Sequence, residues 1–343
     1  MNTTHKDIAK RLQISSKSVA RVLSGGPVSD KMRERVICAA QELSYHENSN
    51  SAARVLAAKR YGKPVRHGVI GCVRDRCDDA GRFPYWMELQ TGIQEAAGAQ
   101  GFSVMMLAGD AMRNWEKVDG VLVHSDGAPF LYKDLPIPIP FVSIMTPAPG
   151  VPSVLADDTS GIRQAVGHLV ALGHRRIGYL IHTENNTPVE AVRLGAYHEA
   201  LRTNGIALGD GWVYDLENCG DFFARGRHSM KLWLENGFRD TGITALLVQN
   251  DHAAMGAMAA LHDAKVRVPQ DLSVIGFDGK SECEVVRPNL SSVHVPLLEI
   301  GAKAVELLLG CILDERIENL PVALPVHLQV RESTAAPSVC IKS

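Results

Sequence analysis

Apolar residues recur at helical spacing in three short stretches of the first 45 residues. A hydroxyl-bearing residue that can cap a helix precedes each stretch, at Thr4, Ser15 and Ser29. About four residues separate the first two stretches, which is the spacing of a helix-turn-helix motif. The pattern predicts a three-helix unit, either a helix-turn-helix domain or a small bundle with solvated charges. The apolar residues that these helices would bury are Ile8, Ala9 and Leu12, then Val19, Val22 and Leu23, then Met32, Val36, Ala39, Ala40 and Leu43.

A different pattern runs through residues 65–335, where short apolar runs alternate with longer amphipathic stretches. This alternation is typical of parallel sheets with helical crossovers. About 270 residues are enough for two such lobes. The predicted fold class is therefore α/β, with two doubly wound parallel sheets after the helical unit. Strands are predicted at 67–73, 102–107, 118–123, 141–145, 176–181, 244–249, 272–277 and 290–295, and helices at 86–99, 161–173, 189–204, 250–264 and 297–313.

Charge separates the two parts of the chain, although the formal net charge is only −2. Residues 1–66 contain 13 Lys and Arg against five Asp and Glu, a net charge of +8, which leaves −10 for the remainder. A basic head on an acidic body indicates a polyanion-binding module joined to a domain of another kind. The alternative is an ordinary solvated helical surface.

Several classes of protein lack their sequence signals here. No apolar run approaches the roughly 20 residues that span a bilayer, and the polar N-terminus lacks the core of an export signal, so we expect a cytoplasmic protein without a membrane partner. Seven cysteines without a CxxC pair are consistent with reduced thiols. The chain has no GxGxxG after its first strand, and no P-loop, HExxH or GxSxG motif. We therefore expect no cofactor, no metal site and no catalytic residue; His168, His174 and His294 are isolated and are expected to be structural or solvated.

Polar side chains follow several of the predicted strands or begin the next helix. Ligands of open parallel sheets bind at the carboxyl ends of the strands, so these positions are candidates for a binding site. Each acidic or amide residue among them could instead be a helix cap, and Asp251 is the one most expected to be only structural. Charged side chains together with an aromatic ring suit a polyhydroxylated ligand. The candidates are Asp157, Asp158, Arg193, Phe222, Asn250, Asp251 and Asp278.

The motifs of the helical unit resemble those of the lactose-repressor/galactose-repressor family of bacterial transcription regulators. The matching segments in order are Asp7-Ile8-Ala9, Ile14-Ser15, Ser18–Gly25, Val28-Ser29, Arg33, Val36 and Glu42–Tyr45. The resemblance continues through "HLVALGHRRIGYL", "VQNDHAAMGAMAAL", "VPQDLSVIGFDG" and "RPNLSSVHVPLLEIG", and so covers nearly the whole chain. It implies that the two lobes form a periplasmic-binding-protein-like domain. The short segments after the second and third strands of the first lobe also resemble the ligand domain of xylose regulators.

For DNA, the resemblance implies that Ser16 and Lys17 open the recognition helix and read bases together with Arg21. Ser15 and Ser18 would hold phosphates, which positions the helix without specifying sequence. A hinge helix would insert Leu56 into the minor groove as a wedge; the alternative is a flexible linker. The full DNA-binding set is Thr4, Ser15, Ser16, Lys17, Ser18, Arg21, Asn50, Ala53 and Leu56.

For the effector, the resemblance places contacts at five residues: Asp158, Arg193, Phe222, Asn250 and Asp278. The segment "FPYWMELQTGI" matches a family motif of the other lobe, so Tyr85 and Trp86 would close the pocket. The ligand is expected to be a small molecule, most simply a sugar.

The expected organisation has four parts: a helix-turn-helix domain at 1–46, a hinge at 47–64, a two-lobed effector and dimerisation domain at 65–335, and a tail at 336–343. The expected function is a nucleoid-associated, homodimeric regulator, a repressor, that binds an approximately palindromic operator under control of the effector. One alternative is a sugar-binding protein with no DNA role, against which the basic head and the missing export signal argue. Another alternative is an enzyme, for which no motif is present.

Overall fold

The computed structural model describes residues 5–23, 27–43, 66–74, 83–108, 115–124, 139–148, 150–183, 187–313 and 321–338. The chain divides into two units, Met1–His67 and Gly68–Ser343. The whole of the predicted hinge, 47–64, therefore falls in the first unit by number but lies outside the described residues. None of the helices in the described ranges is long and apolar enough to cross a membrane.

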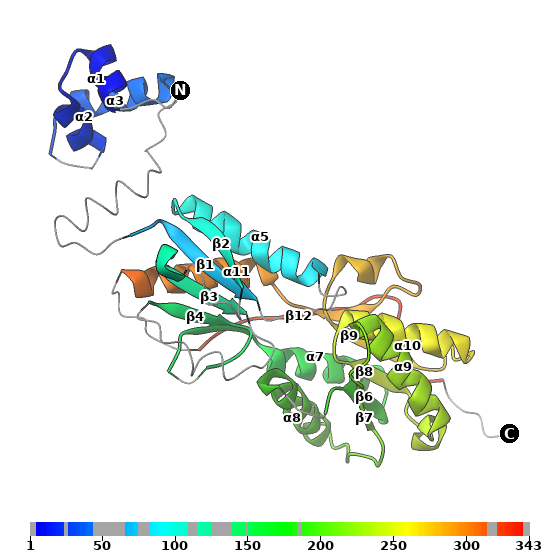
Figure 1. Cartoon of the computed structure of the whole chain (residues 1–343). Helices are drawn as coiled ribbons and strands as arrows, with labels where there is room; N and C mark the ends of the chain where they lie inside the picture. Colours follow the sequence, from blue (N-terminus) through cyan, green and yellow to red (C-terminus); the bar gives the residue numbers. More distant parts are fainter. Residues whose placement is uncertain are drawn as a thin grey trace. The chain divides into compact units, whose positions relative to one another are not determined.

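In its described residues, the smaller unit contains three helices: α1 (His5–Leu12), α2 (Ser16–Leu23) and α3 (Asp30–Glu42) (Figure 1). Ser15 caps α2, because its Oγ accepts a hydrogen bond of 3.0 Å from the backbone N of Ser18. All three helices contribute to one core, as their apolar spacing predicts. The buried core residues are Ile8, Ala9, Val19, Val22, Val36, Ala39 and Ala40.

The first lobe of the larger unit is built on a sheet with the strand order β11-β5-β4-β3-β1-β2. All neighbouring strands in it are parallel. Two helices, α5 (Phe83–Ala99) and α11 (Leu297–Ile312), pack against each other on this lobe (Figure 1). The strands are β1 (Val69–Arg74), β2 (Ser103–Ala108), β3 (Gly120–His124), β4 (Phe141–Ile144), β5 (Ser153–Ala156) and β11 (Val322–Leu324), and a short 3-10 helix, η2 (Trp115–Lys117), precedes β3.

The second lobe repeats this order as β12-β10-β9-β8-β6-β7. Its strands are parallel except β12, which runs antiparallel to β10. Two doubly wound, mainly parallel sheets are therefore present, as the alternating pattern predicts. The strands are β6 (Ile177–Ile181), β7 (Val213–Asp215), β8 (Ala245–Val248), β9 (Ser273–Asp278), β10 (Ser291–His294) and β12 (His327–Gln329).

Helices of the second lobe pack in two pairs, α7 with α8 and α9 with α10 (Figure 1). Right-handed crossovers on either side of β6 require α8 and α9 to cover opposite faces of the sheet. The α9–α10 pair packs closely because Gly226 faces the carbonyl of Ala253, where a Cβ would lie 2.0 Å from that oxygen. The helices are α7 (Asp158–Ala171), α8 (Pro188–Thr203), α9 (Phe222–Glu235) and α10 (Asp251–Asp263), with 3-10 helices η3 (Phe238–Thr241) and η4 (Ser281–Glu284).

The chain passes between the lobes three times, and each passage is short. It crosses from β5 to α7, from β10 to α11 and from β11 to β12. Backbone hydrogen bonds continue the parallel ladders up to the crossovers: Asp157 N donates to the carbonyl of Leu324 in the first lobe, and Val295 N donates to the carbonyl of Asp278 in the second. The carboxyl ends of the central strands of both sheets consequently face one crevice.

Some elements and boundaries differ from the expectation. The strands β7, β11 and β12 are not among the predicted ones. They have three residues each, too few for the alternation of apolar and polar residues to be recognised in the sequence. Helix α9 was also not predicted, because a glycine interrupts its buried face between Phe222 and Met230. The first three residues of the expected tail, 336–338, pack on the second lobe: the Ser338 hydroxyl donates to the carbonyl of Gln270.

Candidate functional site: a crevice between two lobes and an exposed helix

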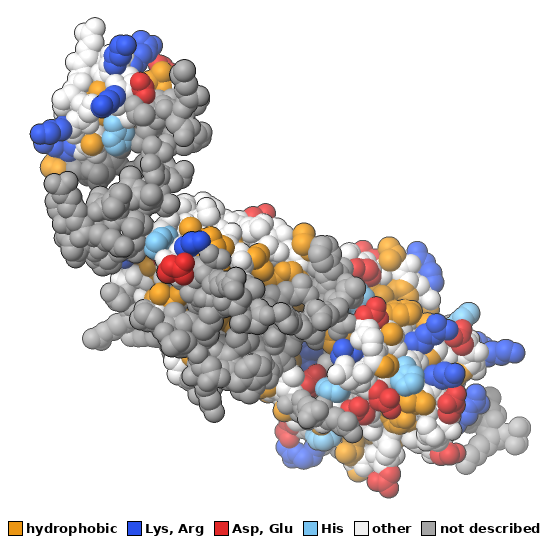
Figure 2. All heavy atoms as spheres, in the orientation of Figure 1, with side chains coloured by type: hydrophobic (Ala, Val, Ile, Leu, Met, Phe, Trp, Pro, Cys, Tyr) orange, Lys and Arg blue, Asp and Glu red, His pale blue; other side chains and the backbone are white. Residues whose placement is uncertain are grey.

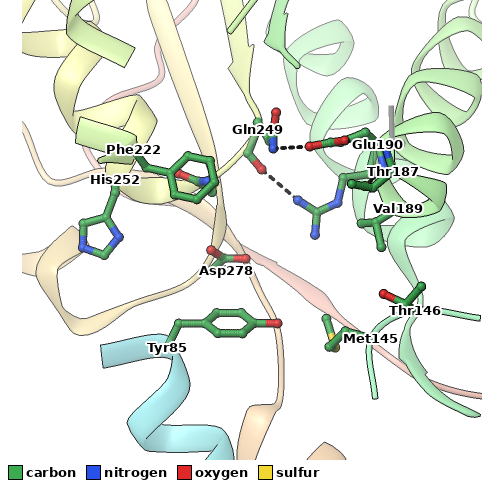
Figure 3. A pocket seen from close by; sticks show the side chains of 12 residues that line it. Tyr85, Met145, Thr146, Thr187, Val189, Glu190, Phe222, Gln249, His252 and Asp278 are labelled. Atoms are coloured by element: carbon green, nitrogen blue, oxygen red, sulfur yellow. Dashed lines mark hydrogen bonds between the residues drawn. The ribbon is translucent and has the colours of Figure 1, made fainter. Parts of the chain in front are cut away.

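A crevice opens between the two lobes at the carboxyl ends of β4, β8 and β9 (Figure 3). The space that it encloses is about 700 Å³, including the part open to solvent. The first lobe contributes Tyr85, Met145 and Thr146. The second lobe contributes Thr187, Val189, Glu190, Arg193, Phe222, Gln249, Asn250, His252 and Asp278.

Arg193 is the buried cation of this wall and lies in the second turn of α8. Its Nε donates to Asp158 Oδ1 at 2.7 Å, and its Nη1 donates to the carbonyl of Gln249 at 2.8 Å. The guanidinium also lies 3.6 Å from the ring centroid of Phe277. These contacts fix the plane of the group, and Nη2 has no hydrogen-bond partner among the described residues. The two N–H groups of Nη2, on a rigidly held guanidinium, are thus left for a ligand.

Arg193 stays protonated and positively charged although its side chain is buried. Burial by itself would lower the pKa of Arg193, but the adjacent carboxylate of Asp158, with weaker help from Tyr179 and Asp278, outweighs it and raises the pKa. A cation held by a buried carboxylate keeps its charge in every solution condition relevant to a cell.

Glu190 and Gln249 form a second buried pair beside Arg193. Gln249 Nε2 donates to Glu190 Oε1 at 2.8 Å, while Gln249 Oε1 accepts from the backbone N of His182 at 2.7 Å. The other carboxylate oxygen of Glu190 accepts from Thr187 N at 2.8 Å, closing the capping box that begins α8. Both side chains are engaged within the protein, so their role in this geometry is to hold α8 against the end of β8.

Asp278 ends β9 with its carboxylate in the crevice, and Figure 3 shows it between Phe222 and Tyr85 in this view. Its φ of 115° is unfavourable for any residue with a side chain and costs about 1–3 kcal/mol. Gly279 follows with a φ of 68°, and a Cβ there would lie 2.5 Å from the Cα of His294. Tight packing therefore forces the turn that aims Asp278 at the crevice.

Asp251 stabilises the turn at Asp278 and Gly279 through hydrogen bonds. It is fully buried, and its carboxylate accepts hydrogen bonds from Ser292 Oγ at 2.5 Å and from Lys280 N at 2.8 Å. Burial, followed by the negative charge of Asp278, raises the pKa of Asp251 to about 7. The residue is structural, as the sequence favoured, but it holds the turn that carries a crevice residue.

Two further crevice residues begin helices. Asn250 caps α10, where its Oδ1 accepts from Ala253 N at 2.9 Å, which leaves its Nδ2 as a donor. Phe222 starts α9 and is 3% exposed, with its ring in the lining of the crevice. A cap and a ligand contact are therefore compatible at Asn250, because the side chain has one acceptor and two donor hydrogens.

The smaller unit presents an exposed polar surface on α2. Ser16, Lys17 and Arg21 are exposed, while Val19 and Val22 face the core. Lys and Arg side chains are scattered over the visible face of this unit in Figure 2. Positive side chains on a short exposed helix that follows a turn provide donors for phosphates and base edges.

The two-lobed crevice and the helical unit with its exposed polar helix both have counterparts in known proteins. Residues 166–334 match the family model of a periplasmic binding protein-like domain. The HTH-type transcriptional regulator CelR of Thermobifida fusca is 30% identical over 335 residues, covering 92% of this chain and 94% of CelR. This chain belongs to the LacI/GalR family of transcriptional regulators.

Solved structures of LacI/GalR regulators match nearly the full length. The lac repressor dimer bound to operator and the anti-inducer ONPF has a TM-score of 0.72 and 25% identity, covering 98% of this chain and 100% of that chain. A CelR–cellobiose complex has a TM-score of 0.67 and 26% identity, covering 97% and 100%. The chain is thus a DNA-binding transcriptional regulator, which confirms the family, the fold class and the class of function expected from the sequence.

Within this LacI/GalR fold, the expected effector residues separate into two groups. The crevice brings together Tyr85, Arg193, Phe222, Asn250 and Asp278. The carboxylate of Asp158 instead lies behind Arg193, 7% exposed, and holds its guanidinium.

The structure does not place Trp86 at the crevice. Its side chain is 5% exposed and packs in the core, with its ring centroid 5.3 Å from that of His124. Successive residues of a helix point about 100° apart, so the face of α5 that puts Tyr85 in the crevice turns Trp86 into the lobe.

The expected DNA contacts are only partly within the described residues. Ser15 and Ser18 hydrogen-bond to each other through their hydroxyls at 2.9 Å, so the predicted phosphate contacts would share these groups with the cap of α2. Thr4, Asn50, Ala53 and Leu56 lie outside the described residues.

Sequence reasoning missed seven lining residues of the crevice: Met145, Thr146, Thr187, Val189, Glu190, Gln249 and His252. The sequence carries a signal for three of them, Gln249, Thr187 and Glu190. Gln249 directly precedes Asn250 at the end of an apolar run, and "TPVE" is a capping box that begins at Thr187. Neither signal shows which side chains face the other lobe.

Proposed function

We propose that this LacI/GalR regulator is a homodimeric repressor whose operator affinity is set by a carbohydrate bound in the crevice. The observation that carries the proposal is the convergence of Arg193 Nη2, Asn250 Nδ2 and the Asp278 carboxylate on one enclosed space. Donors and a charged acceptor at fixed positions suit the vicinal hydroxyls of a sugar. The rings of Tyr85 and Phe222 provide flat apolar surfaces for the C–H face of such a ligand.

The ligand of a related structure points the same way. The CelR structure is a complex with cellobiose. We therefore favour neutral sugars as the first candidates.

The mechanism proposed for the switch uses the three short crossovers. Ligand contacts to Tyr85 on one lobe and to Arg193 and Asp278 on the other favour one separation of the lobes. Such a change reaches the DNA-binding unit only if the two lobe arrangements differ in operator affinity, typically by about 1–3 kcal/mol of coupling. A homodimer would present two copies of α2 to an approximately palindromic operator, in the cytoplasm at the nucleoid.

The test is a thermal-shift screen of the full-length protein with neutral mono- and disaccharides, cellobiose included, followed by calorimetry on the sugars that shift the melting temperature. Asp278→Asn removes the charged acceptor and should weaken binding by about 10- to 150-fold, as expected for a lost charge-assisted hydrogen bond. Asp210→Asn, at an exposed carboxylate outside the crevice, is the matched control. Wild-type affinity of Asp278→Asn would refute the crevice assignment, and a screen without any binding sugar would refute the carbohydrate.

A further inference from the structure

An ion pair joins the two lobes at the rim of the crevice. Lys280 Nζ lies 2.8 Å from Glu88 Oε2. Glu88 is on α5, one turn after Tyr85, and Lys280 follows Asp278 by two residues. The pair therefore connects the two segments that carry facing walls of the crevice. The Lys280 ammonium also lies 5.2 Å from the ring centroid of Tyr85, within cation–π distance.

Burial distinguishes this pair from the surface pairs of the same protein. The side chain of Lys280 is 3% exposed and that of Glu88 is 33% exposed. By contrast, the side chains of the Lys303–Glu306 pair on α11 are 33% and 67% exposed, and both lie on one helix. Exposed pairs contribute little, whereas a buried ammonium that loses its carboxylate is strongly disfavoured.

Both partners stand on rigid supports. Lys280 N donates to the buried carboxylate of Asp251 at 2.8 Å. Helix α5 packs directly on α11, where a Cβ at Gly92 would lie 2.2 Å from the carbonyl oxygen of Leu298. Because neither backbone can follow the other when the lobes move apart, separation of the lobes at this rim must break the ion pair.

We propose that the Glu88–Lys280 ion pair holds the two lobes together in the absence of ligand, so that Lys280 is a positioning residue for the gap between Tyr85 and Asp278. The importance of that gap rests on the proposed function of the crevice, but the ion pair itself is testable without any ligand. Its loss shifts the protein toward arrangements with the lobes further apart, while each lobe stays folded.

Hydrogen–deuterium exchange of the full-length, ligand-free protein measures this opening. The backbone N–H of Lys280 donates to Asp251, and the Lys280 side chain is buried against Glu88 and Tyr85 of the other lobe, so this amide meets solvent and exchanges faster when the lobes separate. Glu88→Gln and Lys280→Met should each speed exchange at the amide of residue 280 about tenfold, with no change in the central strands β3 and β8. The double variant should match the single ones, because both lose the same interaction. Lys303→Met, which removes the surface pair on α11, is the matched control and should leave exchange at residue 280 unchanged.

Unchanged exchange at the amide of residue 280 in both single variants would overturn the proposal. Equal acceleration throughout both lobes would do so too, because it would show a general loss of stability. If Lys280→Met does not fold, Glu88→Gln decides the question, since this side chain is one-third exposed and the amide keeps its shape. The outcome is independent of the sugar screen, so failure of the carbohydrate proposal would not be confused with failure of this one.

Discussion

The DNA-binding unit and the effector crevice are built in opposite ways. The side chains expected to read DNA, Ser16, Lys17 and Arg21, lie within six residues on one exposed helix, above a core of seven buried residues. The crevice instead draws on segments from Tyr85 to Asp278, and its polar groups are held by buried partners. A local surface can tolerate the loss of one side chain without loss of structure, whereas a non-local, buried site couples binding to stability.

The largest effect is expected at Arg193, where binding and stability should fall together. Arg193→Met leaves the carboxylate of Asp158 buried without its cation, which costs about 3–5 kcal/mol of unfolding free energy. Urea denaturation of the full chain, followed by tryptophan fluorescence, measures this change. The double variant Arg193→Met/Asp158→Asn should regain part of the stability without regaining sugar binding.

Arg202→Met is the matched control for this change. Its side chain is 75% exposed in a surface pair with Glu199, so the free energy of unfolding should stay close to that of the wild type. If the two arginine variants were equally destabilised, the burial of Arg193 would not explain the loss of unfolding free energy.

A smaller effect, confined to DNA, is expected at Arg21. Arg21→Ala should cost about 1–3 kcal/mol at one base pair of each half-site and relax the preference there, while the melting temperature stays close to that of the wild type. Binding to operator variants by fluorescence anisotropy at several salt concentrations measures both discrimination and salt dependence. The slope of log affinity against log salt should change by no more than about one, because most phosphate contacts remain. Undiminished discrimination would mean that Arg21 does not read bases.

A further effect, which depends on pH, is expected at Asp251, the buried residue that supports the crevice. Because burial and the charge of Asp278 raise the pKa of Asp251 to about 7, the folded state retains a proton that the unfolded chain releases near its ordinary value of 3.8. This group therefore lowers stability as pH rises from about 4 to 7, by at most about 1.4 kcal/mol per pH unit, and has no further effect above that range. Asp251→Asn should remove this contribution, so the stability difference between variant and wild type should change with pH over that window. A difference that is constant with pH would contradict the raised pKa.

The sequence by itself determined the parts of this protein that depend on neighbours along the chain. Helical spacing and caps indicated α1, α2 and α3, because a short helix is specified by its own apolar face. The alternation of buried strands and helices indicated two α/β lobes. The polar residues after β8 and at the end of β9 indicated Asn250 and Asp278, since strand ends in a parallel sheet share one edge.

Only the tertiary structure decided which of these side chains face a ligand and which support them. Tyr85 and Trp86 are adjacent in sequence, yet the packing of α5 on its lobe sends one ring to the crevice and the other into the core. Asp158 and Arg193 are separated by 35 residues, and their contact at 2.7 Å exists only because α7 and α8 pack together. The same holds for Glu88 and Lys280, 192 residues apart in sequence and brought together by the three crossovers between the lobes. Contacts of this kind depend on how whole helices and strands are placed relative to one another. That placement is set by the burial of many apolar side chains in the cores of both lobes, and no local pattern of residues encodes it.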